Sequence, residues 1–386
     1  MLVLIAAGGT GGHIYPALAV ARSLTTRTDP PDLRWVGGRR GLEARLVPPS
    51  GIPLHLLTLR SLRSTEASVH LALDPMRLAA STPQAAALLA RLRPAAIFTT
   101  GGYVAIPVLS AAAAMRIPSL LWDGNVRPGR SVRATARFAS AIAVSHPETA
   151  AALAAAGGDA RAYVTGTPIR DPATVDREEA RERLEIPPGP RVVLVSGGSQ
   201  AVARFSAAVA GALPRLVEKV AVVHVTGEDG YAAALAAREA LPEARRGRYR
   251  PYPFLRDEMT AALAAADLVV GRAGASTLAE VAAFGVPMVV VPYPHAAGHQ
   301  RANAAALVDA GAAVLVADED FDADALLGAT TILDDPQRHL AMSAAARALG
   351  RPGAAAAVSE VLLALAERRP LPEVAAIEAL AAGARP

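Results

Sequence analysis

Short, uninterrupted apolar runs that alternate with helix-length stretches constrain this chain more than any other feature of its sequence. A run without polar alternation indicates a strand buried on both faces, and helix-length connections between such strands indicate βαβ units and parallel sheets. The predicted strands are Leu2–Ala7, Leu33–Val36, Ala96–Phe98, Ser119–Trp122, Ala141–Val144, Ala162–Val164, Val192–Ser196, Ala221–Val225, Leu268–Val270, Met288–Val291 and Ala313–Val316. The sequence therefore predicts an α/β fold with doubly wound parallel sheets.

The pattern of a buried strand followed by a glycine turn occurs at the N-terminus and starts again in Arg191–Ser199. The stretch before this restart, Asp171–Pro190, is rich in charge and proline, which is typical of a connection between domains. At 386 residues the chain is long enough for two domains, each with its own core. We therefore expect an N-terminal domain over residues 1–170 and a C-terminal domain over residues 171–350.

The last segment, residues 351–386, contains one more Ala- and Leu-rich helix, from about Ala354 to Arg368. We expect this helix to return to the N-terminal domain. The tail after Pro370 is rich in alanine and proline, and we expect it to fray.

The composition excludes several classes of protein and of site. The chain has no cysteine, which excludes disulfides, thiolate catalysis and cysteine-based zinc sites. The formal net charge is +4 without dense basic runs, so we expect no nucleic-acid partner. The opening run Met1–Ile5 has no basic stretch before it and indicates a buried strand rather than a signal peptide.

One uncharged stretch, Ala95–Met115, is long enough to cross a bilayer. It contains the pair Gly101-Gly102 and Pro107, which favour a strand, a loop and a helix over a single spanning helix. We therefore expect a soluble protein whose membrane contact, if it has any, is peripheral.

The strongest motif is Gly8-Gly9-Thr10-Gly11-Gly12-His13, between the first strand and a helix that we expect to begin near Pro16. Glycines permit positive φ and leave backbone amides free at a helix N-terminus, which suits a phosphate or a closely packed sugar. The turn is neither a dinucleotide fingerprint nor a P-loop, since no Gly-Lys-Ser/Thr follows. A tight turn without a ligand is the alternative. His13 is placed to act as a base, or else only to cap the turn.

A second glycine turn, Ser196-Gly197-Gly198-Ser199-Gln200, also lies between a strand and a helix. It offers backbone amides, the Ser199 hydroxyl and a helix dipole to an anion. Alone it is equally consistent with a plain turn between a strand and a helix, and it gains weight from its pairing with the first turn.

A third motif, Gly271–Glu280, follows the strand that ends at Val270, with a helix expected to begin near Ser276. The first-turn amides and the hydroxyls of Ser276 and Thr277 suit a phosphate. Glu280 follows on the helix, where a carboxylate accepts hydrogen bonds from two ribose hydroxyls, or else it is a solvated charge.

Potential metal ligands occur in two places, and neither predicts a metal site. His295 and His299 have the spacing of zinc ligands, but no glutamate follows His295 and no third ligand is evident. The acidic runs Asp318-Glu319-Asp320 and Asp322-x-Asp324 lie in a polar loop, where solvated charge is the ordinary explanation. We expect no metal.

Together these segments resemble one known family, the bacterial UDP-N-acetylglucosamine–N-acetylmuramyl-(pentapeptide) pyrophosphoryl-undecaprenol N-acetylglucosamine transferases, which make lipid II from lipid I. The resemblance covers nearly the whole chain, to about Leu365, and is most specific from Gly8 to Ala21. Further matching segments are Gly37–Glu43, Gly101–Val104, Gly166–Arg170, Gly197–Gln200, Arg272–Glu280 and His299-Gln300 with Asn303. The resemblance implies a glycosyltransferase-B fold, in which two doubly wound Rossmann-like domains face each other across a cleft.

The resemblance also implies a role for particular residues. The N-terminal domain would bind the acceptor, lipid I, and the C-terminal domain would bind the donor, UDP-N-acetylglucosamine, without a cofactor. The donor's sugar end would contact Thr10, Gly11 and Gly12, and its diphosphate would contact Ser199. Asn125 and Arg170 would contact donor or product, Leu255 would meet uracil through its backbone, and Gln300 would bind sugar hydroxyls. Phosphate and ribose would be held by Ala275, Ser276, Thr277, Leu278, Ala279 and Glu280.

Chemistry and resemblance together predict an inverting transfer. An acceptor hydroxyl attacks C1 of the sugar while UDP leaves from the opposite face, with His13 as the candidate base. Amides of the glycine turns and helix dipoles stabilise the departing diphosphate, and closing of the domains excludes water.

The chain departs from the family pattern at three places. Trp122-Asp123-Gly124-Asn125 stands where the family often has His-Glu-Gln-Asn, Ala201 ends the second glycine turn, and Gly166-Thr167-Pro168 stands where the family has Gly-Asn-Pro. These changes leave the donor residues in place and alter the acceptor-side neighbours of Asn125.

Apolar and cationic residues of the N-terminal half suggest a membrane-facing surface. On a common face they would meet anionic lipid heads and acyl chains at the cytoplasmic side of the inner membrane, although solvated arginines beside core leucines would give the same pattern. These residues are Arg60, Leu62, Arg63, Leu71, Leu73, Met76, Arg77 and Arg116.

Three other functions fit the same motifs. A related glycosyltransferase would use a different acceptor, and a UDP-sugar epimerase built on the same two-domain plan would release free sugar. A non-catalytic protein that binds sugar nucleotides is the third, and the intact His13 and Glu280 motifs disfavour it.

Overall fold

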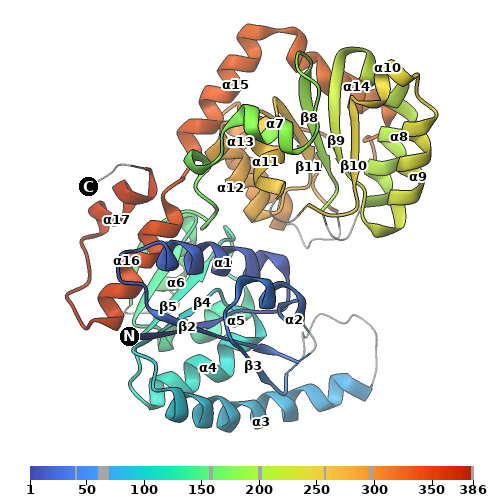
Figure 1. Ribbon diagram of the computed structural model, residues 1–386. Helices are drawn as coiled ribbons and strands as arrows, with labels where there is room; N and C mark the ends of the chain where they lie inside the picture. Colours follow the sequence, from blue (N-terminus) through green and yellow to red (C-terminus); the bar gives the residue numbers. More distant parts are fainter. Residues whose placement is uncertain are drawn as a thin grey trace. The chain divides into compact units, whose positions relative to one another are not determined.

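Every described strand belongs to one of two parallel sheets. The computed structural model describes all residues of the chain except 40, 60–68, 156–159, 199–201, 256–257, 295–298 and 384–386. The chain divides into a first unit, Met1–Ile169 with Arg351–Pro386, and a second unit, Arg170–Gly350. In each unit helices cover both faces of the sheet (Figure 1).

The sheet of the first unit has the strand order β3-β2-β1-β4-β5-β6-β7. Its strands are β1 (Leu2–Ala6), β2 (Asp32–Gly38), β3 (Leu54–Leu57), β4 (Ala96–Thr99), β5 (Ser119–Asp123), β6 (Ala141–Val144) and β7 (Arg161–Val164). Its helices are α1 (Gly11–Thr25), α2 (Glu43–Leu46), α3 (Val69–Leu92), α4 (Gly102–Ala114), α5 (Arg130–Thr135), α6 (Pro147–Ala155), α16 (Ala354–Ala366) and α17 (Val374–Ala381), with 3₁₀ turns at Pro48–Ser50 and Ala136–Phe138. The order reverses between β1 and β4, so these neighbouring strands form the switch point where ligands bind in such sheets.

Alternate residues of β1 enter different cores, which explains its uninterrupted apolar sequence. Val3 and Ile5 pack with α1 and α16, whereas Leu4 and Ala6 pack with α3 and α4 on the other face. Figure 1 shows α3 and α4 on the face opposite α1 and α16. The strand is therefore buried on both sides, as the run of apolar residues predicts.

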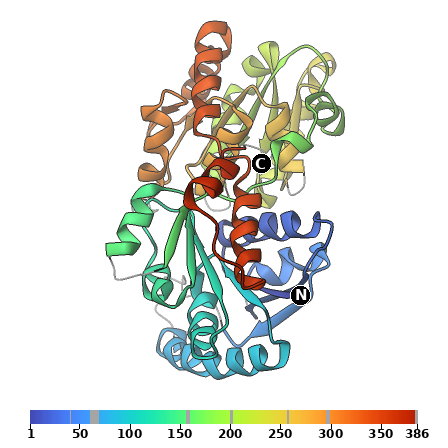
Figure 2. The same ribbon diagram turned by 90° about the vertical axis from the view of Figure 1, so that its left-hand side faces the viewer.

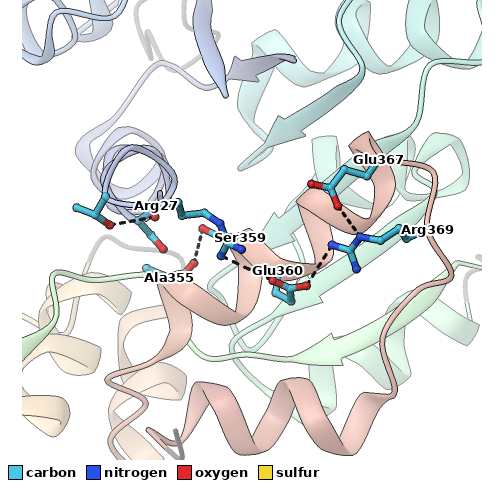
Figure 3. Close-up of polar contacts among 8 residues, drawn as sticks. Arg27, Ala355, Ser359, Glu360, Glu367 and Arg369 are labelled. Atoms are coloured by element: carbon cyan, nitrogen blue, oxygen red, sulfur yellow. Dashed lines mark hydrogen bonds and ion pairs between the residues drawn. The ribbon is translucent and has the colours of Figure 1, made fainter. Parts of the chain in front are cut away.

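The chain returns to the first unit after Gly350, where α16 packs on α1 and α17 lies beside it (Figure 2). Polar contacts mark the exposed edge of this packing: Glu360 on α16 forms ion pairs with Arg27 at 3.8 Å and with Arg369 at 3.3 Å (Figure 3). On the sheet, the Tyr163 hydroxyl of β7 donates to the carbonyl of Pro372 at 2.9 Å. The C-terminal helices are thus part of the first unit's structure. The expectation that the tail after Pro370 frays is wrong for Val374–Ala381, which form α17 and bury Ile377 and Ala381 in the core.

The sheet of the second unit has the order β10-β9-β8-β11-β12-β13, which reverses between β8 and β11. Its strands are β8 (Arg191–Ser196), β9 (Val220–Val225), β10 (Tyr249–Tyr252), β11 (Leu268–Gly271), β12 (Met288–Val290) and β13 (Ala313–Leu315). Its helices are α7 (Arg177–Arg183), α8 (Val202–Lys219), α9 (Glu228–Glu239), α10 (Glu243–Arg246), α11 (Glu258–Ala265), α12 (Ala275–Phe284), α13 (His299–Asp309), α14 (Ala323–Thr330) and α15 (Pro336–Leu349), with 3₁₀ turns at Pro172–Thr174 and Thr331–Asp334.

All eleven strands predicted from apolar runs are present, with ends shifted by a residue or two, and two strands were missed. The missed strands, β3 and β10, lie at the edges of the two sheets. The uncharged stretch Ala95–Met115 forms β4, a loop and α4, as predicted.

By length and composition one stretch, Pro336–Ala366, is apolar enough to cross a membrane, but 61% of its most apolar window is buried within the protein. The stretch consists of two helices, α15 in the second unit and α16 in the first, separated by residues 350–353. The buried core helices of water-soluble proteins are commonly long and apolar enough to meet these criteria, and α16 is such a core helix.

Candidate functional site

The first glycine turn lies at the carboxyl end of β1, at the switch point of the first sheet. The helix after it begins at Gly11, earlier than the predicted start near Pro16. Thr10 is the extended N-cap, and its carbonyl already accepts the amides of His13 (3.0 Å) and Ile14 (3.1 Å), so the helix is established before the proline. Within Gly8–Gly12 only Gly9 has a positive φ, of 100°. Thr10, Gly11 and Gly12 therefore present the N-terminal amides of α1.

His13 reaches from this turn to the loop between β4 and α4. Its Nδ1 lies 2.7 Å from the carbonyl oxygen of Thr100, and the Thr100 hydroxyl donates to the His13 carbonyl at 2.9 Å. A carbonyl only accepts, so Nδ1 carries the hydrogen, and in the neutral ring the lone pair is then on Nε2. The half-buried imidazole is thus oriented across the switch point in the tautomer that a general base requires.

A buried carboxylate that the sequence analysis did not single out lies beneath the turn. The side chain of Glu43 is fully buried and accepts hydrogen bonds from the amide of Gly9 and the hydroxyl of Tyr103. Sequence similarity over Gly37–Glu43 was the signal, but it did not indicate what the carboxylate contacts.

Asn125 follows β5 and is held by a second buried carboxylate. Oδ1 of Asp123 accepts the backbone amide of Asn125 at 3.1 Å and its side-chain Nδ2 at 3.0 Å. Thr149 donates to the Asn125 carbonyl at 2.6 Å. Burial raises the pKa of the Asp123 carboxyl above its usual range, and the hydrogen bonds from Asn125 partly offset that rise. Asp123 therefore fixes the orientation of the Asn125 amide.

The departures from the family pattern have structural partners. The Trp122 indole is buried in the core and donates through Nε1 to the carbonyl of Gly166 at 3.0 Å. The hydroxyls of Thr167 and Ser145 form a hydrogen bond of 2.8 Å. Trp122 and Thr167 thus contribute to the packing at the carboxyl edge of β5, β6 and β7, and the third departure, Ala201, lies outside the described residues.

In the second unit, the glycine turn after β8 lies next to the loop after β11. A Cβ on Gly271 would lie 2.9 Å from the Ser196 carbonyl oxygen, so only glycine permits this approach. Gly198 has a positive φ of 68°. Ser199, with Gln200 and Ala201, lies outside the described residues.

Arg272 follows β11, is buried, and contacts the loop after β12, the loop after β13 and helix α8. Its Nη1 donates to the carbonyl of Val291 at 3.1 Å and forms an ion pair with Asp318 at 2.5 Å, and its guanidinium lies 4.8 Å from the ring centre of Phe205. The interpretation of the acidic run as solvated is therefore wrong for Asp318, because β13 ends beside Arg272. It holds for Asp324, whose side chain is 91% exposed.

Helix α12 begins at Ala275 after the N-cap Gly274. The amides of Ala275, Ser276 and Thr277 precede the first intrahelical bond, which Leu278 donates to Gly274 at 3.0 Å, so they are available to an anion. Leu278 itself is buried in the core. This turn thus offers backbone amides and two hydroxyls at the carboxyl edge of the second sheet.

Glu280 is not the solvated charge that the sequence allowed as an alternative. Burial raises the pKa of its carboxyl to about 7, and the charge of Arg170 opposes that rise. The side chain is half-buried one turn into α12, next to Ala279. Arg170 and Glu280 are therefore near enough to interact electrostatically within the second unit.

The remaining predicted residues follow β10 and β12. Leu255 is buried in the core, which leaves its backbone as the part that can meet a ligand. Gln300 lies in the first turn of α13, where its Oε1 accepts the amide of Tyr293 at 2.8 Å. His295 and the side chain of His299 lie outside the described residues. Within the described ranges no group of three or more acidic or histidine side chains could hold a metal ion.

The predicted site residues that the structure describes therefore fall into two sets, one in each unit. All of them except Arg170, which precedes the first strand of the second sheet, follow strands of their own unit's sheet. The first unit contributes Thr10, Gly11, Gly12, His13 and Asn125, and the second contributes Arg170, Leu255, Ala275–Glu280 and Gln300.

Two family models match most of the chain. The glycosyltransferase family 28 N-terminal domain matches residues 3–144, and the glycosyltransferase family 28 C-terminal domain matches residues 192–358. The two matches fall on the two sheets and include both switch points.

Curated relatives match over nearly their full length. The chain is 39% identical over 373 residues to the UDP-N-acetylglucosamine--N-acetylmuramyl-(pentapeptide) pyrophosphoryl-undecaprenol N-acetylglucosamine transferase of Desulforudis audaxviator, covering 95% of this chain and 99% of that protein. It is 37% identical over 370 residues to the protein of the same name from Moorella thermoacetica, covering 94% and 98%.

Solved structures agree with these matches. Acinetobacter baumannii MurG superimposes with a TM-score of 0.69 at 29% identity, over 94% of this chain and 99% of that one. A UDP-N-acetylglucosamine 2-epimerase from Neisseria meningitidis reaches a TM-score of 0.66 over 94% and 99%, but at 12% identity it shares the fold alone. The predicted glycosyltransferase-B fold, with two Rossmann-like domains, is confirmed.

Proposed function

The chain belongs to glycosyltransferase family 28, and on this premise we propose that it transfers N-acetylglucosamine from UDP-N-acetylglucosamine to lipid I, forming lipid II in peptidoglycan synthesis. The observation that carries the proposal is the 39% identity, along nearly the whole chain, to a protein named for this reaction. The chain is thus a UDP-N-acetylglucosamine-dependent, inverting hexosyltransferase. The epimerase shares only the fold.

In the proposed reaction, a hydroxyl oxygen of lipid I forms a bond to C1 of N-acetylglucosamine. The bond between C1 and the diphosphate oxygen breaks on the opposite face, and UDP leaves with the electron pair. The proton of the hydroxyl passes to Nε2 of His13. The hydrogen bond from Nδ1 to Thr100 supports this role, because it leaves the lone pair on Nε2.

We propose that the second unit holds the nucleotide. The amides of Ala275, Ser276 and Thr277 and the hydroxyls of Ser276 and Thr277 bind phosphate, supported by their place in the first turn of α12. Leu278 and Ala279 follow on the same helix and complete the phosphate and ribose site. Glu280 accepts the ribose hydroxyls, and the Leu255 backbone meets uracil. In the same proposal Ser199 binds the diphosphate, Gln300 binds sugar hydroxyls, and Asn125 and Arg170 contact donor or product. The sugar end of the donor contacts Thr10, Gly11 and Gly12.

We further propose that the protein acts as a peripheral protein at the cytoplasmic side of the membrane. Its acceptor carries an undecaprenyl chain, which keeps the reacting sugar near the lipid surface. The apolar and cationic residues from Arg60 to Arg77 support this location by their composition. Their side chains lie outside the described part of the chain.

A transfer assay tests the proposal. Purified protein is incubated with UDP-N-acetylglucosamine labelled in the sugar, with and without lipid I in detergent micelles. We expect label in the lipid fraction only when lipid I is present, and inversion at C1 in the product. Release of free N-acetylmannosamine in the absence of lipid I would instead identify an epimerase.

The variant His13→Ala tests the base. We expect turnover to fall by a factor of about 100 or more, while calorimetric binding of UDP is retained. Wild-type turnover in this variant would remove His13 from the mechanism without affecting the donor and acceptor assignment.

A further inference from the structure

We propose that Glu43 is a positioning residue for the transfer, one that fixes the backbone of the Gly8–Gly12 turn and ties it to the loop before α4. The inference rests on the proposed role of His13 as the base. Glu43 lies on the one-turn helix α2, which follows β2, and its side chain has no exposed surface.

The Glu43 carboxylate accepts three hydrogen bonds from three different segments. Oε2 accepts the amide of Gly9 at 2.9 Å. Oε1 accepts the amide of Gly38 at 2.7 Å and the hydroxyl of Tyr103 at 2.6 Å. Burying a carboxylate is costly unless its oxygens are satisfied, and three donors meet that requirement here. The charge is therefore held where the first glycine turn needs an acceptor.

Three glycines leave the space that this carboxylate fills. A Cβ on Gly37 would lie 2.5 Å from Cγ of Glu43, and a Cβ on Gly8 or Gly41 would strike its carboxylate group. An apolar side chain would fill the same space without accepting the amide of Gly9. The three glycines thus make room for a polar group, which points to a role beyond filling the core.

The Glu43 link and the His13 link both start from the β1–α1 turn, and they reach neighbouring positions at the N-terminus of α4 and in the loop before it. His13 reaches from the β1–α1 turn to Thr100, and Glu43 connects Gly9 of that turn to Tyr103 at the start of α4. Between the two links, Gly102 packs so closely that a Cβ there would lie 3.2 Å from the Gly8 carbonyl oxygen. A shift of either loop would therefore move the Thr100 carbonyl relative to the His13 ring, and with it Nε2.

The test is the variant Glu43→Gln, which keeps the shape of the side chain. Whichever way the amide lies, its NH₂ group faces the N–H of Gly9 or that of Gly38, so one backbone donor loses its acceptor. We expect kcat to fall by a factor of about 10 to 100, because a misplacement of the order of 1 Å has such effects. The UDP dissociation constant should stay unchanged, since the proposed nucleotide residues belong to the second unit. Tyr103→Phe should give a smaller loss in the same direction.

Two controls separate positioning from stability. Asp335→Ala removes the N-cap of α15, where the carboxylate accepts the amides of Gln337 and Arg338 at 3.0 Å. It should lower the melting temperature and leave kcat unchanged. Kinetics of all variants are measured well below their melting temperatures, so that a loss of kcat in Glu43→Gln reflects the folded enzyme.

A double-mutant cycle with His13→Ala gives the decisive readout. If Glu43 acts through His13, Glu43→Gln costs little further activity once the imidazole is gone, and the two effects do not multiply. Multiplying effects, or wild-type kcat in Glu43→Gln, would overturn the proposal. If His13→Ala alone keeps wild-type activity, the base assignment fails, whereas a loss of kcat in Glu43→Gln with unchanged UDP binding still supports positioning of the turn.

Discussion

Trp122 leaves no room for a side chain at position 124: a Cβ on Gly124 would lie 2.5 Å from Cη2 of the indole. The indole is held in place by its burial in the core and by the hydrogen bond from Nε1 to Gly166. Tryptophan for histidine and glycine for glutamine, two substitutions within the same departure from the family pattern, are therefore expected to be coupled. Asn125 keeps its place because its backbone amide and its side-chain Nδ2 donate hydrogen bonds to Asp123, which lies between positions 122 and 124.

Glutamine at position 124 should accordingly lower the stability of the protein when Trp122 is present, and lower it less when Trp122 is replaced by histidine. We expect Gly124→Gln to destabilise the protein by about 1–3 kcal/mol through overpacking against the indole. In the background of Trp122→His, which removes the larger ring, the same change should cost less. Melting temperatures of the two single variants and the double variant give the coupling, and strictly additive shifts would show that the two positions are independent.

The acidic run after β13 contains carboxylates in opposite environments, which permits a matched comparison. Asp318, 15% exposed, pairs with the buried Arg272, whereas Asp324, 91% exposed, lies 3.6 Å from an exposed Arg215. Asp318→Asn should destabilise by about 3 kcal/mol, because it leaves a buried guanidinium without its counter-charge. Asp324→Asn should change the melting temperature by an amount near the error of measurement.

The same pair of variants also tests whether Arg272 supports the turn before α12 that we propose binds the nucleotide. Arg272 immediately precedes the Ala273–Ala275 segment that leads into α12, so loss of the Asp318 contact should weaken UDP binding as well as stability. Unchanged UDP affinity in Asp318→Asn would restrict the ion pair to a purely structural role.

Interior strands could be predicted from the sequence because both of their faces are buried, which leaves an uninterrupted apolar run. The two missed strands, β3 and β10, are edge strands that lack that signature, whereas the edge strands β7 and β13 have short apolar runs and were predicted. In β3 the residues Leu54, His55 and Leu56 are half-buried or exposed, and β10 contains Arg250 and Pro251. Proline is tolerated there because an edge strand has one unpaired side.

The candidate site was predictable to the extent that its residues lie on turns. Glycine turns after buried strands revealed Thr10–His13 and the start of α12, since the carboxyl ends of parallel strands carry the ligand sites. The role of Glu43 was hidden, because its partners Gly9 and Tyr103 are 34 and 60 residues away along the chain. Contacts over such separations follow from the fold and have no local pattern.

If Glu280 binds the ribose as proposed, stability and nucleotide binding should respond to pH in opposite directions. Its pKa is about 7 in the folded protein against an ordinary value of 4.5. Between these values the folded protein binds more protons than the unfolded chain, so this group's contribution to stability is lost as the pH rises through that window. Ribose hydroxyls donate to the ionised form, so donor affinity should rise over the same range.

The variant Glu280→Gln separates the two effects. Because it cannot ionise, it should melt at a higher temperature than the wild type at about pH 8 and differ little from it at about pH 5. Its affinity for UDP-N-acetylglucosamine should be lower than that of the wild type and should not rise with pH.

The intact sugar nucleotide is the better ligand for this titration, because its diphosphate is esterified at both ends and does not itself titrate in this range. A wild-type affinity that is flat across the range would show that the carboxylate does not meet the ribose, whereas a flat difference in melting temperature would show that burial does not perturb the group.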